Sequence, residues 1–360
     1  MYIVSCWKTD YTVLPVAATM QNSTYDQGPD IYLRLIDERV FWLVLAIVGF
    51  ALCTVMTVAN FIVMATIYRD PQKSLRTPPC LLIANLASSD FLVGLCVVSL
   101  VAFRDVYRSL LQQVPLPLSV GIFVSYVLCT TLFVSSATMV ALSVTCFVAI
   151  DSPMQYKTKI TKKRAYVFII VIWLLSALIC FLPATKVPEK TYLLIYIHTH
   201  ISLPALFLMV IYAKSFRALA RRRRELQLND HASDENNKRA LERERNMAVT
   251  VIIILAIFYI TYLPQFIMIH VARYCSSCEI SEDSTTFHKV DVITSRFVFL
   301  NSALNPFVYA WRMPKYRRAL NSSWKALKEK FGLSSPRVEV GPLFLFSTRI
   351  VRESATTVST

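Results

Sequence analysis

The sequence predicts an all-α membrane protein, a seven-transmembrane helix bundle followed by an amphipathic eighth helix. The 360 residues are 55% apolar and their mean hydropathy is +0.49, a balance that soluble chains of this length seldom reach. The apolar residues gather in runs, and a helix needs about 20 such residues to cross a bilayer. The alternating ten-residue segments of a membrane β-barrel are absent, so the spans are predicted to be helices.

Seven spans follow one another along the chain. The first, third, fourth and sixth are clear, whereas the seventh is the weakest because Arg296 interrupts it, and a buried hairpin is the alternative there. The predicted spans are residues 40–67, 80–103, 118–150, 165–184, 192–212, 247–271 and 292–311.

The distribution of basic residues predicts the orientation of the chain. Twenty-eight Lys and Arg residues lie in the first, third and fifth connections and in the C-terminal tail, against 9 on the other side. The positive-inside rule then places the N-terminus outside and the C-terminus in the cytoplasm. The sequon Asn22-Ser23-Thr24, a candidate glycosylation site, falls on the outer side and agrees with this orientation.

The net charge of +15 is clustered, which favours an anionic membrane surface as its partner over nucleic acid. Residues 314–331 form the predicted eighth helix, and its helical spacing suits a helix that lies flat on the inner leaflet. The apolar residues on its one face are Tyr316, Leu320, Trp324, Leu327 and Phe331. The expected division is an extracellular segment 1–39, the bundle 40–311, the membrane-surface helix 312–332 and a flexible cytoplasmic tail 333–360.

Several polar side chains fall inside the predicted spans, where they are costly and usually functional. Asp90 is the most prominent, and Asn301 and Asn305 share one helix face, as do Thr131 and Ser135. The predicted polar cluster is Asn60, Asp90, Ser135, Asn301 and Asn305. A sodium ion with waters is one way to neutralise Asp90, and a protonated carboxyl held by hydrogen bonds is the other. No other cofactor and no metal site are expected.

One motif in each span resembles the rhodopsin-like (class A) G-protein-coupled receptors. The match covers roughly residues 40–331. The motifs are A-N-F-I-V with Asn60, N-L-A-S-S-D with Asp90, A-I-D-S-P-M-Q-Y after the third span, Trp173, Pro204 with Tyr212, Phe258 with Pro264, and N-P-F-V-Y from Asn305 to Tyr309. The resemblance implies a plasma-membrane receptor for an extracellular ligand, with a heterotrimeric G protein as its partner.

The switch that the family uses at the inner face is altered. The family's Asp-Arg-Tyr is replaced by Thr145-Cys146-Phe147, so the cation that faces an acid on span six is missing. Glu244 marks the position of that acid. The family's Cys-Trp-x-Pro reads Thr-Tyr-Leu-Pro here, and Pro264 can still bend the helix. The expected switch residues are Cys146, Tyr212, Glu244, Phe258, Pro264, Pro306 and Tyr309.

The narrower pattern around N-P-F-V-Y-A-W-R-M-P-K-Y resembles adenosine and melanocortin receptors. Their ligands do not carry over, because Ile269 replaces a base-binding Asn and Leu128 replaces the counter-ion Asp of amine receptors. The implied pocket lies between the outer halves of spans three, five, six and seven. Its expected lining is Leu128, Leu132, His200, Tyr262, Gln265, Ile269, Arg296 and Phe299. Arg296 favours an anionic or carbonyl-bearing ligand, unless it extends outward to the headgroups.

The usual disulfide from span three to the second outer loop cannot form, because no Cys lies between Cys96 and Cys129 and none lies in that loop. Cys275 and Cys278 are expected to pair within the third outer loop, with free thiols or a bond to Cys6 as alternatives. Two thiols alone do not make a zinc site.

Two functions from different classes remain open. The first is a G-protein-coupled receptor with raised basal activity, since a resting Arg–Glu contact is lost. The second is a receptor-like protein without G-protein coupling, a scavenger or a partner of other receptors, for which Cys146 is the main support. A transporter would need a continuous polar path, and no catalytic constellation indicates an enzyme.

Overall fold

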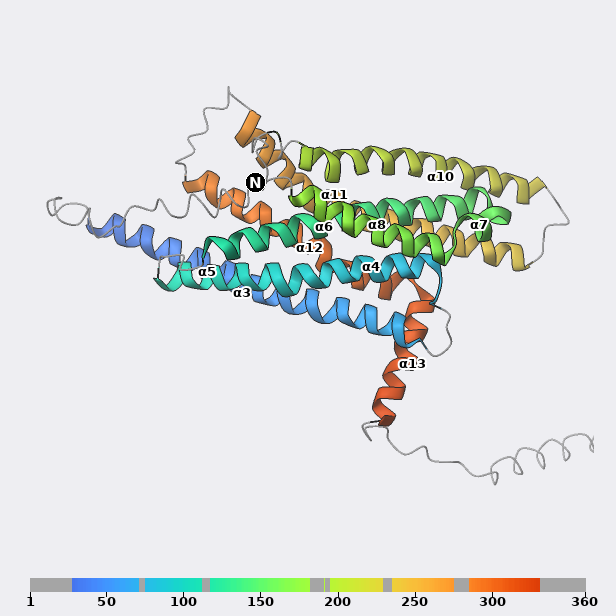
Figure 1. Ribbon diagram of the computed structural model, residues 1–360, viewed down its shortest axis with the longest axis horizontal. Helices are drawn as coiled ribbons and strands as arrows, with labels where there is room; N and C mark the ends of the chain where they lie inside the picture. The colour runs from blue at the N-terminus through green and yellow to red at the C-terminus, as the bar shows by residue number, and fades with distance from the viewer. Residues whose placement is uncertain are drawn as a thin grey trace, which may run out of the picture. The chain divides into compact units, whose positions relative to one another are not determined.

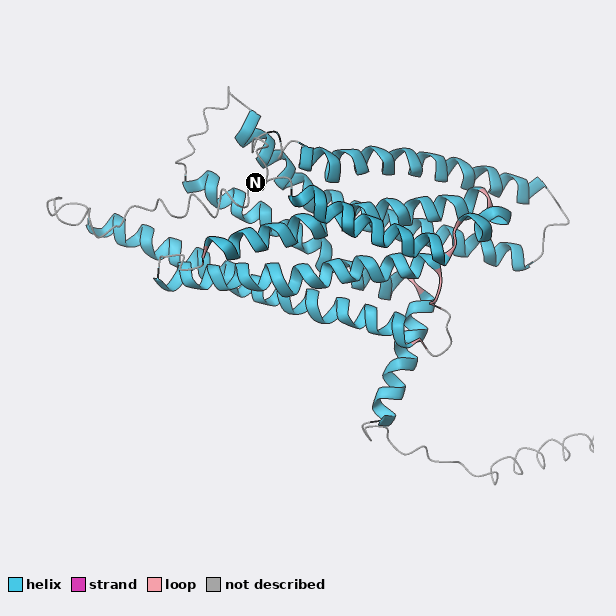
Figure 2. Cartoon of the chain, in the orientation of Figure 1, coloured by secondary structure: helices cyan, strands magenta, loops and turns pink. Residues whose placement is uncertain are grey.

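The computed structural model describes residues 28–70, 75–111, 117–181, 191, 195–228, 235–274 and 285–330. The described residues are helical apart from short turns and contain no strand (Figure 2). An all-helical chain is what the sequence predicted, since a bilayer leaves no water to satisfy backbone groups that are not paired within the helix.

Seven membrane-spanning helices lie side by side in the unit that ends at Ala319 (Figure 1). Two of them contain a short π-helical segment. The spans are α3 (Gly28–Arg69); α4 (Pro78–Leu92) with η2 (Val93–Val98) and α5 (Ser99–Leu111); α6 (Leu118–Asp151); α8 (Lys162–Phe181); η4 (His198–Ser202) with α10 (Leu203–Leu228); α11 (Glu235–Tyr274); and α12 (Thr285–Arg312). The short α7 (Pro153–Lys159) and α13 (Pro314–Lys330) complete the described helices.

Six of these helices are long and apolar enough to cross a membrane by composition alone, and α12 is the seventh. Arg296 interrupts the apolar run of α12, but the helix is continuous through this residue and packs against α11 and α3. The buried-hairpin alternative for this segment is therefore wrong.

The second span is longer than predicted. The charges that follow Phe103 were taken as its end, yet α5 continues to Leu111 with Arg104, Asp105 and Arg108 all buried. These charges do not end the helix because they find partners inside the bundle. The fourth span ends among the described residues at Phe181, and residues 182–184 and 192–194 of the predicted spans lie outside them.

Prolines mark several helix starts. Thr77 is extended, and Pro78 and Pro79 occupy the first turn of α4, where the missing N–H would have no partner in the helix. Pro153 opens α7 in the same way directly after Ser152, at the end of α6. At this turn the amide of Ser152 donates to Val148 at 3.1 Å, and Pro153 has no N–H that needs a partner.

Gly94, in the wide π-helical turn η2, permits a close approach of the first two spans. A Cβ atom on Gly94 would lie 2.8 Å from Cβ of Met56 and 3.0 Å from Oγ1 of Thr57. Without a hydrophobic force between helices in lipid, such close packing of small residues is a main source of helix association. Met56 is the centre of a buried cluster with Val93, Val97 and Phe299.

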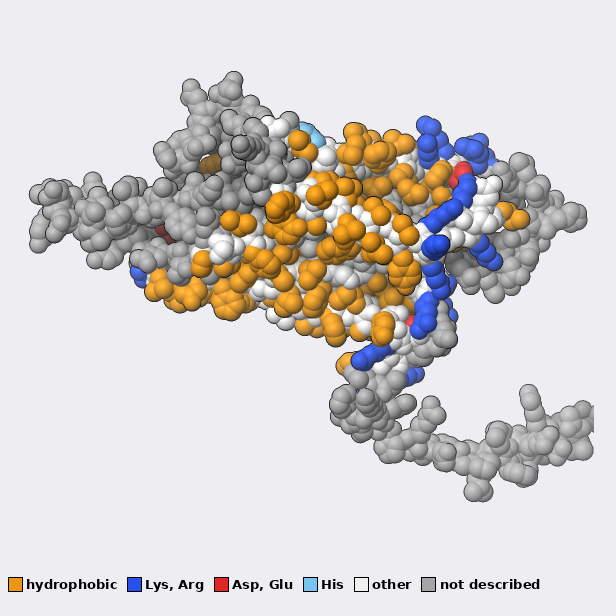
Figure 3. Space-filling model, in the orientation of Figure 1, with side chains coloured by type: hydrophobic (Ala, Val, Ile, Leu, Met, Phe, Trp, Pro, Cys, Tyr) orange, Lys and Arg blue, Asp and Glu red, His pale blue; other side chains and the backbone are white. Residues whose placement is uncertain are grey.

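The surface carries a broad apolar area, with Lys and Arg side chains gathered at one end of it (Figure 3). Exposed aliphatic and aromatic residues such as Ile47, Leu174 and Met209 cover the helices, as expected of groups that face lipid. The turn between α7 and α8 supplies exposed basic residues at the end where the positive-inside rule predicts cytoplasm. These residues are Lys157, Lys159, Lys162, Lys163 and Arg164.

The predicted eighth helix is present as α13, which begins at Pro314 after a single residue, Met313. Tyr316 is buried in the unit that holds the bundle, and burial raises the pKa of its hydroxyl, opposed by a hydrogen bond with Thr66. In the second unit, Nζ of Lys328 lies 5.8 Å from the ring centroid of Trp324. Phe331, the last predicted apolar residue, lies outside the described residues. The domain boundaries and the flexible tail stay predictions.

Candidate functional site

A cavity of about 150 Å³ lies between α5, α6, η4, α11 and α12. The structure brings all eight residues of the predicted pocket to its wall. They are Leu128, Leu132, His200, Tyr262, Gln265, Ile269, Arg296 and Phe299. The positions that the resemblance suggested therefore converge in space, and their role in binding a ligand stays a prediction.

Aromatic rings form one end of this cavity. Tyr262 stacks on Phe258 with ring centroids 4.3 Å apart, and its other side meets the edge of His200 at 6.4 Å. His200 is buried, and its Nδ1 lies 2.7 Å from the carbonyl oxygen of Tyr196, one turn earlier. His200 is thus both a partnered interior histidine and a wall of the cavity. The stack connects the cavity wall to Phe258, a predicted switch residue.

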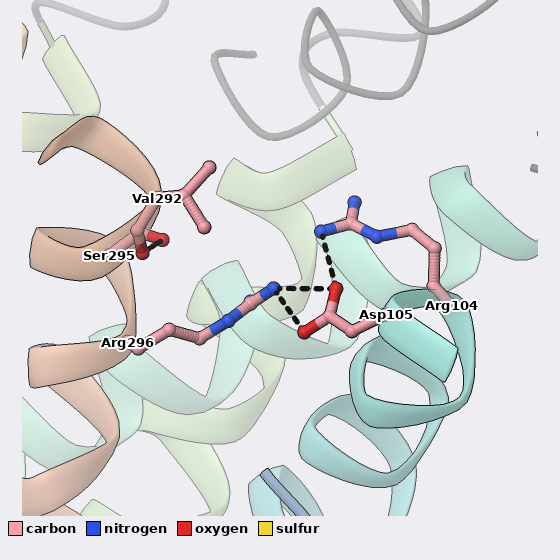
Figure 4. Close-up of polar contacts among 5 residues, drawn as sticks. All are labelled: Arg104, Asp105, Val292, Ser295 and Arg296. Atoms are coloured by element: carbon pink, nitrogen blue, oxygen red, sulfur yellow. Dashed lines mark hydrogen bonds and ion pairs between the residues drawn. The ribbon is translucent and has the colours of Figure 1, made fainter. Parts of the chain in front are cut away.

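A buried ion pair joins span seven to span two at the edge of the cavity, which Arg296 lines (Figure 4). Nη2 of Arg296 donates to both carboxylate oxygens of Asp105, at 3.1 and 2.9 Å. Arg104 approaches the same carboxylate at 3.7 Å from the other side. The side chain of Arg296 is only 13% exposed, so the alternative in which it extends outward to the headgroups is wrong.

Further polar groups line the same cavity. Nε2 of Gln265 donates to Asp291 at 3.2 Å, and Thr294 donates to the amide oxygen of Gln265 at 2.7 Å. The guanidinium of Arg108 lies 4.3 Å from the ring centroid of Trp42. Arg104, Arg108 and Arg296 set against Asp105 and Asp291 leave this region with one formal positive charge in excess.

Sequence reasoning missed Arg104, Asp105, Arg108 and Asp291, and counted Arg296 as the one charge of the pocket. The signal was available: Asp105 and Arg104 follow an apolar run directly, and Arg108 lies one turn further on the same helix. A charge in the seventh span needs a partner inside the bundle, so an acid at the end of another span was the place to look.

The predicted polar cluster forms in part around Asp90, which is fully buried. Ser302 donates to its Oδ1 at 2.6 Å, and Nδ2 of Asn305 donates to its Oδ2 at 2.9 Å. Ser302 was not predicted, although it neighbours Asn301. Ser135 instead pairs with Ser89 at 2.8 Å, without a direct bond to the carboxylate. Asn301 is buried, and no described residue bonds its side-chain amide.

Pro306 explains how Asn60 joins this cluster. A proline inside a helix leaves the carbonyl four residues earlier without its amide partner, and here that carbonyl belongs to Ser302. Nδ2 of Asn60 donates to it at 3.2 Å. A marker residue of span one thus satisfies the break in span seven, while the hydroxyl of the same serine holds Asp90.

The oxygen atoms near Asp90 suit a hard cation such as sodium. The amide oxygens of Asn60 and Asn305 are buried, have no hydrogen-bond partner among the described residues, and are of the kind that such a cation takes as ligands. The residues therefore fit the ion that the sequence suggested. A protonated Asp90 remains the competing arrangement.

The inner end of α6 is apolar where the family has its arginine. Cys146 is buried with Ile150 and with Ala218 of α10. Tyr212 lies nearby, with its hydroxyl 3.3 Å from that of Ser143. Tyr309 is fully buried, and no described residue bonds its hydroxyl. The contacts described at this end include the packing of Cys146 on Ala218 and the hydroxyl pair of Ser143 and Tyr212.

The remaining predicted residues are placed only in part. Pro264 lies inside α11, and Glu244 belongs to the same helix, but the side chain of Glu244 is outside the described residues. Asn22, Cys275 and Cys278 also lie outside them, so the glycosylation site and the disulfide stay predictions.

The comparisons with known proteins agree with this architecture. The family model of the 7 transmembrane receptor (rhodopsin family) matches residues 59–309. Lysophosphatidic acid receptor 1 of Homo sapiens is 24% identical over 278 residues, covering 73% of this chain and 71% of the receptor. The same receptor of Ovis aries is 24% identical, and the match spans 66% of its length. Trace amine-associated receptor 7f of Mus musculus is 26% identical over 336 residues, covering 85% of this chain and 86% of that protein.

Among solved structures, squid rhodopsin matches with a TM-score of 0.66 at 19% identity, covering 84% of this chain and 88% of that one, and it shows the fold. The narrower resemblance to adenosine and melanocortin receptors stays a prediction. Proteins of this kind are multi-pass membrane receptors rather than enzymes. With the family model matching well over half of its residues, the chain belongs to the rhodopsin family of seven-transmembrane receptors.

Proposed function

We propose that the chain is a plasma-membrane receptor that binds an extracellular ligand in the cavity of Arg296 and couples to a heterotrimeric G protein. The N-terminus is outside in this proposal. The single observation that carries it is the convergence of the eight pocket residues, predicted from the resemblance, on one cavity. The basic end formed by the α7–α8 turn supports the orientation, because basic residues concentrate on the cytoplasmic side.

The ligand is proposed to be an anionic amphiphile. Leu128, Ile269 and Phe299 supply apolar walls. Three arginines line the cavity against one carboxylate, Asp291, and they still exceed the acids by one formal charge when Asp105 beside the cavity is counted. An acidic headgroup would compete with Asp105 for Arg296 and Arg104. The name of one relative, lysophosphatidic acid receptor 1, points to a ligand of this chemistry, although 24% identity does not carry the ligand itself. An amine would find no carboxylate at Leu128, and Asp291, the one acid among the described lining residues, already accepts a hydrogen bond from Gln265.

Transmission is proposed to pass through the aromatic stack. A ligand against Tyr262 acts on Phe258 through ring contact at 4.3 Å. Two residues beyond Tyr262, Pro264 leaves the carbonyl of Ile260 without its helical partner, which allows α11 to bend there. The ligand shifts the equilibrium only as far as its affinity differs between the closed and the open inner face.

Raised basal activity is part of the proposal. An exposed Arg–Glu contact is worth on the order of 1 kcal/mol. Its loss at Cys146 raises the active fraction several-fold, by the exponential relation between free energy and population.

A ligand panel tests the proposal about chemistry. Cells that express the chain receive a lysophosphatidic acid, a long-chain fatty acid and a long-chain primary amine, and G-protein dissociation is recorded. The acidic amphiphiles are expected to act, and Arg296→Gln is expected to weaken their potency roughly tenfold, for one charge-assisted contact. Lys289→Gln serves as the control, since Lys289 also lies on α12 but pairs with Asp37 at the surface. Activation by the amine alone would contradict the proposed ligand class.

A further inference from the structure

A second hollow of the bundle is a groove of about 480 Å³ bounded by α6, α8 and α10. It shares no lining residue with the cavity of Arg296. Several of its residues are exposed although they belong to membrane-spanning helices: Val144 is 39%, Leu203 49% and Phe207 55% exposed. In a bilayer such side chains meet lipid, so the groove opens toward lipid.

The described residues in the middle of the groove offer no free hydroxyl donor to an occupant, although three Ser and Thr side chains line it. Each of these hydroxyls donates to a carbonyl of its own helix: Ser136 to Phe133 at 3.0 Å, Thr145 to Ala141 at 2.7 Å, and Thr199 to Ile195 at 2.7 Å. Their hydrogen-bonding demand is met within the helices, so the groove presents methyl and methylene groups to its occupant. A hydrocarbon chain is the matching partner.

The inner end of the groove is basic. Lys159 closes α7, and Arg164 lies in the first turn of α8. Nη1 of Arg164 donates to the carbonyls of Thr158 at 3.3 Å and Lys159 at 2.7 Å, which holds the guanidinium over the turn between the two helices. The described residues that line the groove include no Asp or Glu. An anionic group is therefore favoured at this end.

The length of the groove fits one leaflet. Along α6 it extends from Phe133 to Thr145, which is about 18 Å at 1.5 Å per residue. Half of the hydrocarbon core of a bilayer is about 15 Å thick. A chain that starts at the basic end would thus reach the middle of the membrane.

We infer that this groove binds an anionic phospholipid of the cytoplasmic leaflet, with its phosphate at Lys159 and Arg164 and an acyl chain between α6 and α10. The choice of leaflet rests on the orientation proposed above. Thr145 lines the groove and directly precedes Cys146, which packs against Ala218 of α10. The lipid therefore contacts α6 beside the altered switch and reaches α10 at Leu203, Pro204 and Phe207, near the start of that helix.

Native mass spectrometry of the purified full-length chain tests the site, with palmitoyl-oleoyl phosphatidylserine and the phosphatidylcholine of the same acyl chains as probes. Each basic residue near a membrane surface contributes about fivefold in affinity for anionic lipid. Phosphatidylserine is expected to bind roughly tenfold or more tightly than phosphatidylcholine. The double variant Lys159→Ala/Arg164→Ala is expected to abolish this preference.

The matched control is Lys157→Ala/Lys163→Ala, which removes the same charge from the same two helices at exposed residues that do not line the groove. It is expected to retain the preference within about twofold. If the two double variants lose the preference for phosphatidylserine equally, general surface charge explains the binding and the site is overturned. Equal binding of the two lipids by the natural chain would also overturn it.

A phosphatidylserine with a diazirine on its acyl chain locates the lipid. Labelling is expected on peptides that contain Val144 or Phe207 and is expected to fall at least fivefold in Lys159→Ala/Arg164→Ala. Labels confined to other helices would overturn the inference. Both measurements use a symmetric lipid supply, so their failure is distinct from a wrong orientation, which is tested by antibody access to a terminal tag on intact cells.

Discussion

The two ends of the bundle hold their helices together by opposite means. At the end of the ligand cavity, Arg296 of α12 and Asp105 of α5 form a hydrogen-bonded ion pair, with Arg104 beside it. At the other end of α6, Cys146 packs on Ile150 and Ala218. The family keeps an arginine at the position of Cys146, whereas this chain has an apolar contact there and a charged one in the cavity.

The difference concerns the cost of movement. Separating the partners of a buried ion pair leaves uncompensated charge and is costly, whereas sliding an apolar contact loses only a part of its packing. The helices at the cavity end are therefore expected to stay fixed relative to one another, and those at the inner end to separate readily. An acidic ligand that binds Arg296 in place of Asp105 would weaken the contact that fixes the helices at the cavity end.

The largest expected effect comes from breaking the buried pair. Asp105→Asn leaves the charge of Arg296 without its carboxylate and is expected to cost about 3 kcal/mol. At roughly 2 °C per kcal/mol, the melting temperature in nanodiscs should fall by about 6 °C. The control is Asp37→Asn, which also removes an acid that pairs with α12, but at a position where the Asp side chain is 69% exposed.

The exposed pair of Asp37 and Lys289 is expected to contribute at most about 1 kcal/mol. Equal shifts of the melting temperature in the two variants would show that the buried pair has no special role. The double variant Asp105→Asn/Arg296→Gln sharpens the comparison, because it should lose less than the sum of the two single changes.

The second prediction concerns the packing of the first two spans against each other. Gly94→Val places methyl groups where even a Cβ would lie 2.8 Å from Met56, and overpacking of this kind costs about 1–3 kcal/mol. The melting temperature of Gly94→Val should fall by several degrees, and that of Gly94→Ala should fall by less. A valine variant as stable as the natural chain would mean that the two spans separate without penalty.

A smaller effect is expected from sodium at Asp90, which we propose as its counter-ion between the two ends. The melting temperature should rise by about 2 °C when sodium chloride replaces choline chloride at equal ionic strength, since an ion present at several times its dissociation constant contributes about 1 kcal/mol. Asp90→Asn should abolish the difference. If the melting temperature of the natural chain is the same in the two salts, a protonated Asp90 without a sodium ion is favoured.

The sequence was sufficient for the seven spans because each needs a long apolar run, and the motif in each span fixed which residues face inward. It was insufficient wherever a charge finds its partner only in the folded chain. Asp105 was taken as a span end, although its pairing with Arg296 keeps it inside. Ser302 was missed because its role depends on Pro306, which frees its carbonyl, and on Asp90 from another helix.

Which residues of the second span share a helix face also could not be predicted from residue spacing alone. The π-helical turn η2 inserts an extra residue between Asp90 and Asp105. The residues V-G-L-C-V-V contain no pattern that predicts this turn. By contrast, all eight predicted pocket residues line one cavity, because the resemblance places them in the outer halves of four neighbouring spans.

Basal G-protein dissociation in cells, measured for the natural chain and for Cys146→Arg at equal surface expression, tests the central claim most directly. Cys146→Ser is the control, since it removes the thiol without adding a cation. The natural chain is expected to dissociate G protein without ligand, and the arginine, by restoring a resting contact worth about 1 kcal/mol, should reduce this signal several-fold. A natural chain that is silent at every expression level, together with an arginine variant that signals, would contradict the account and identify a receptor-like protein that does not couple.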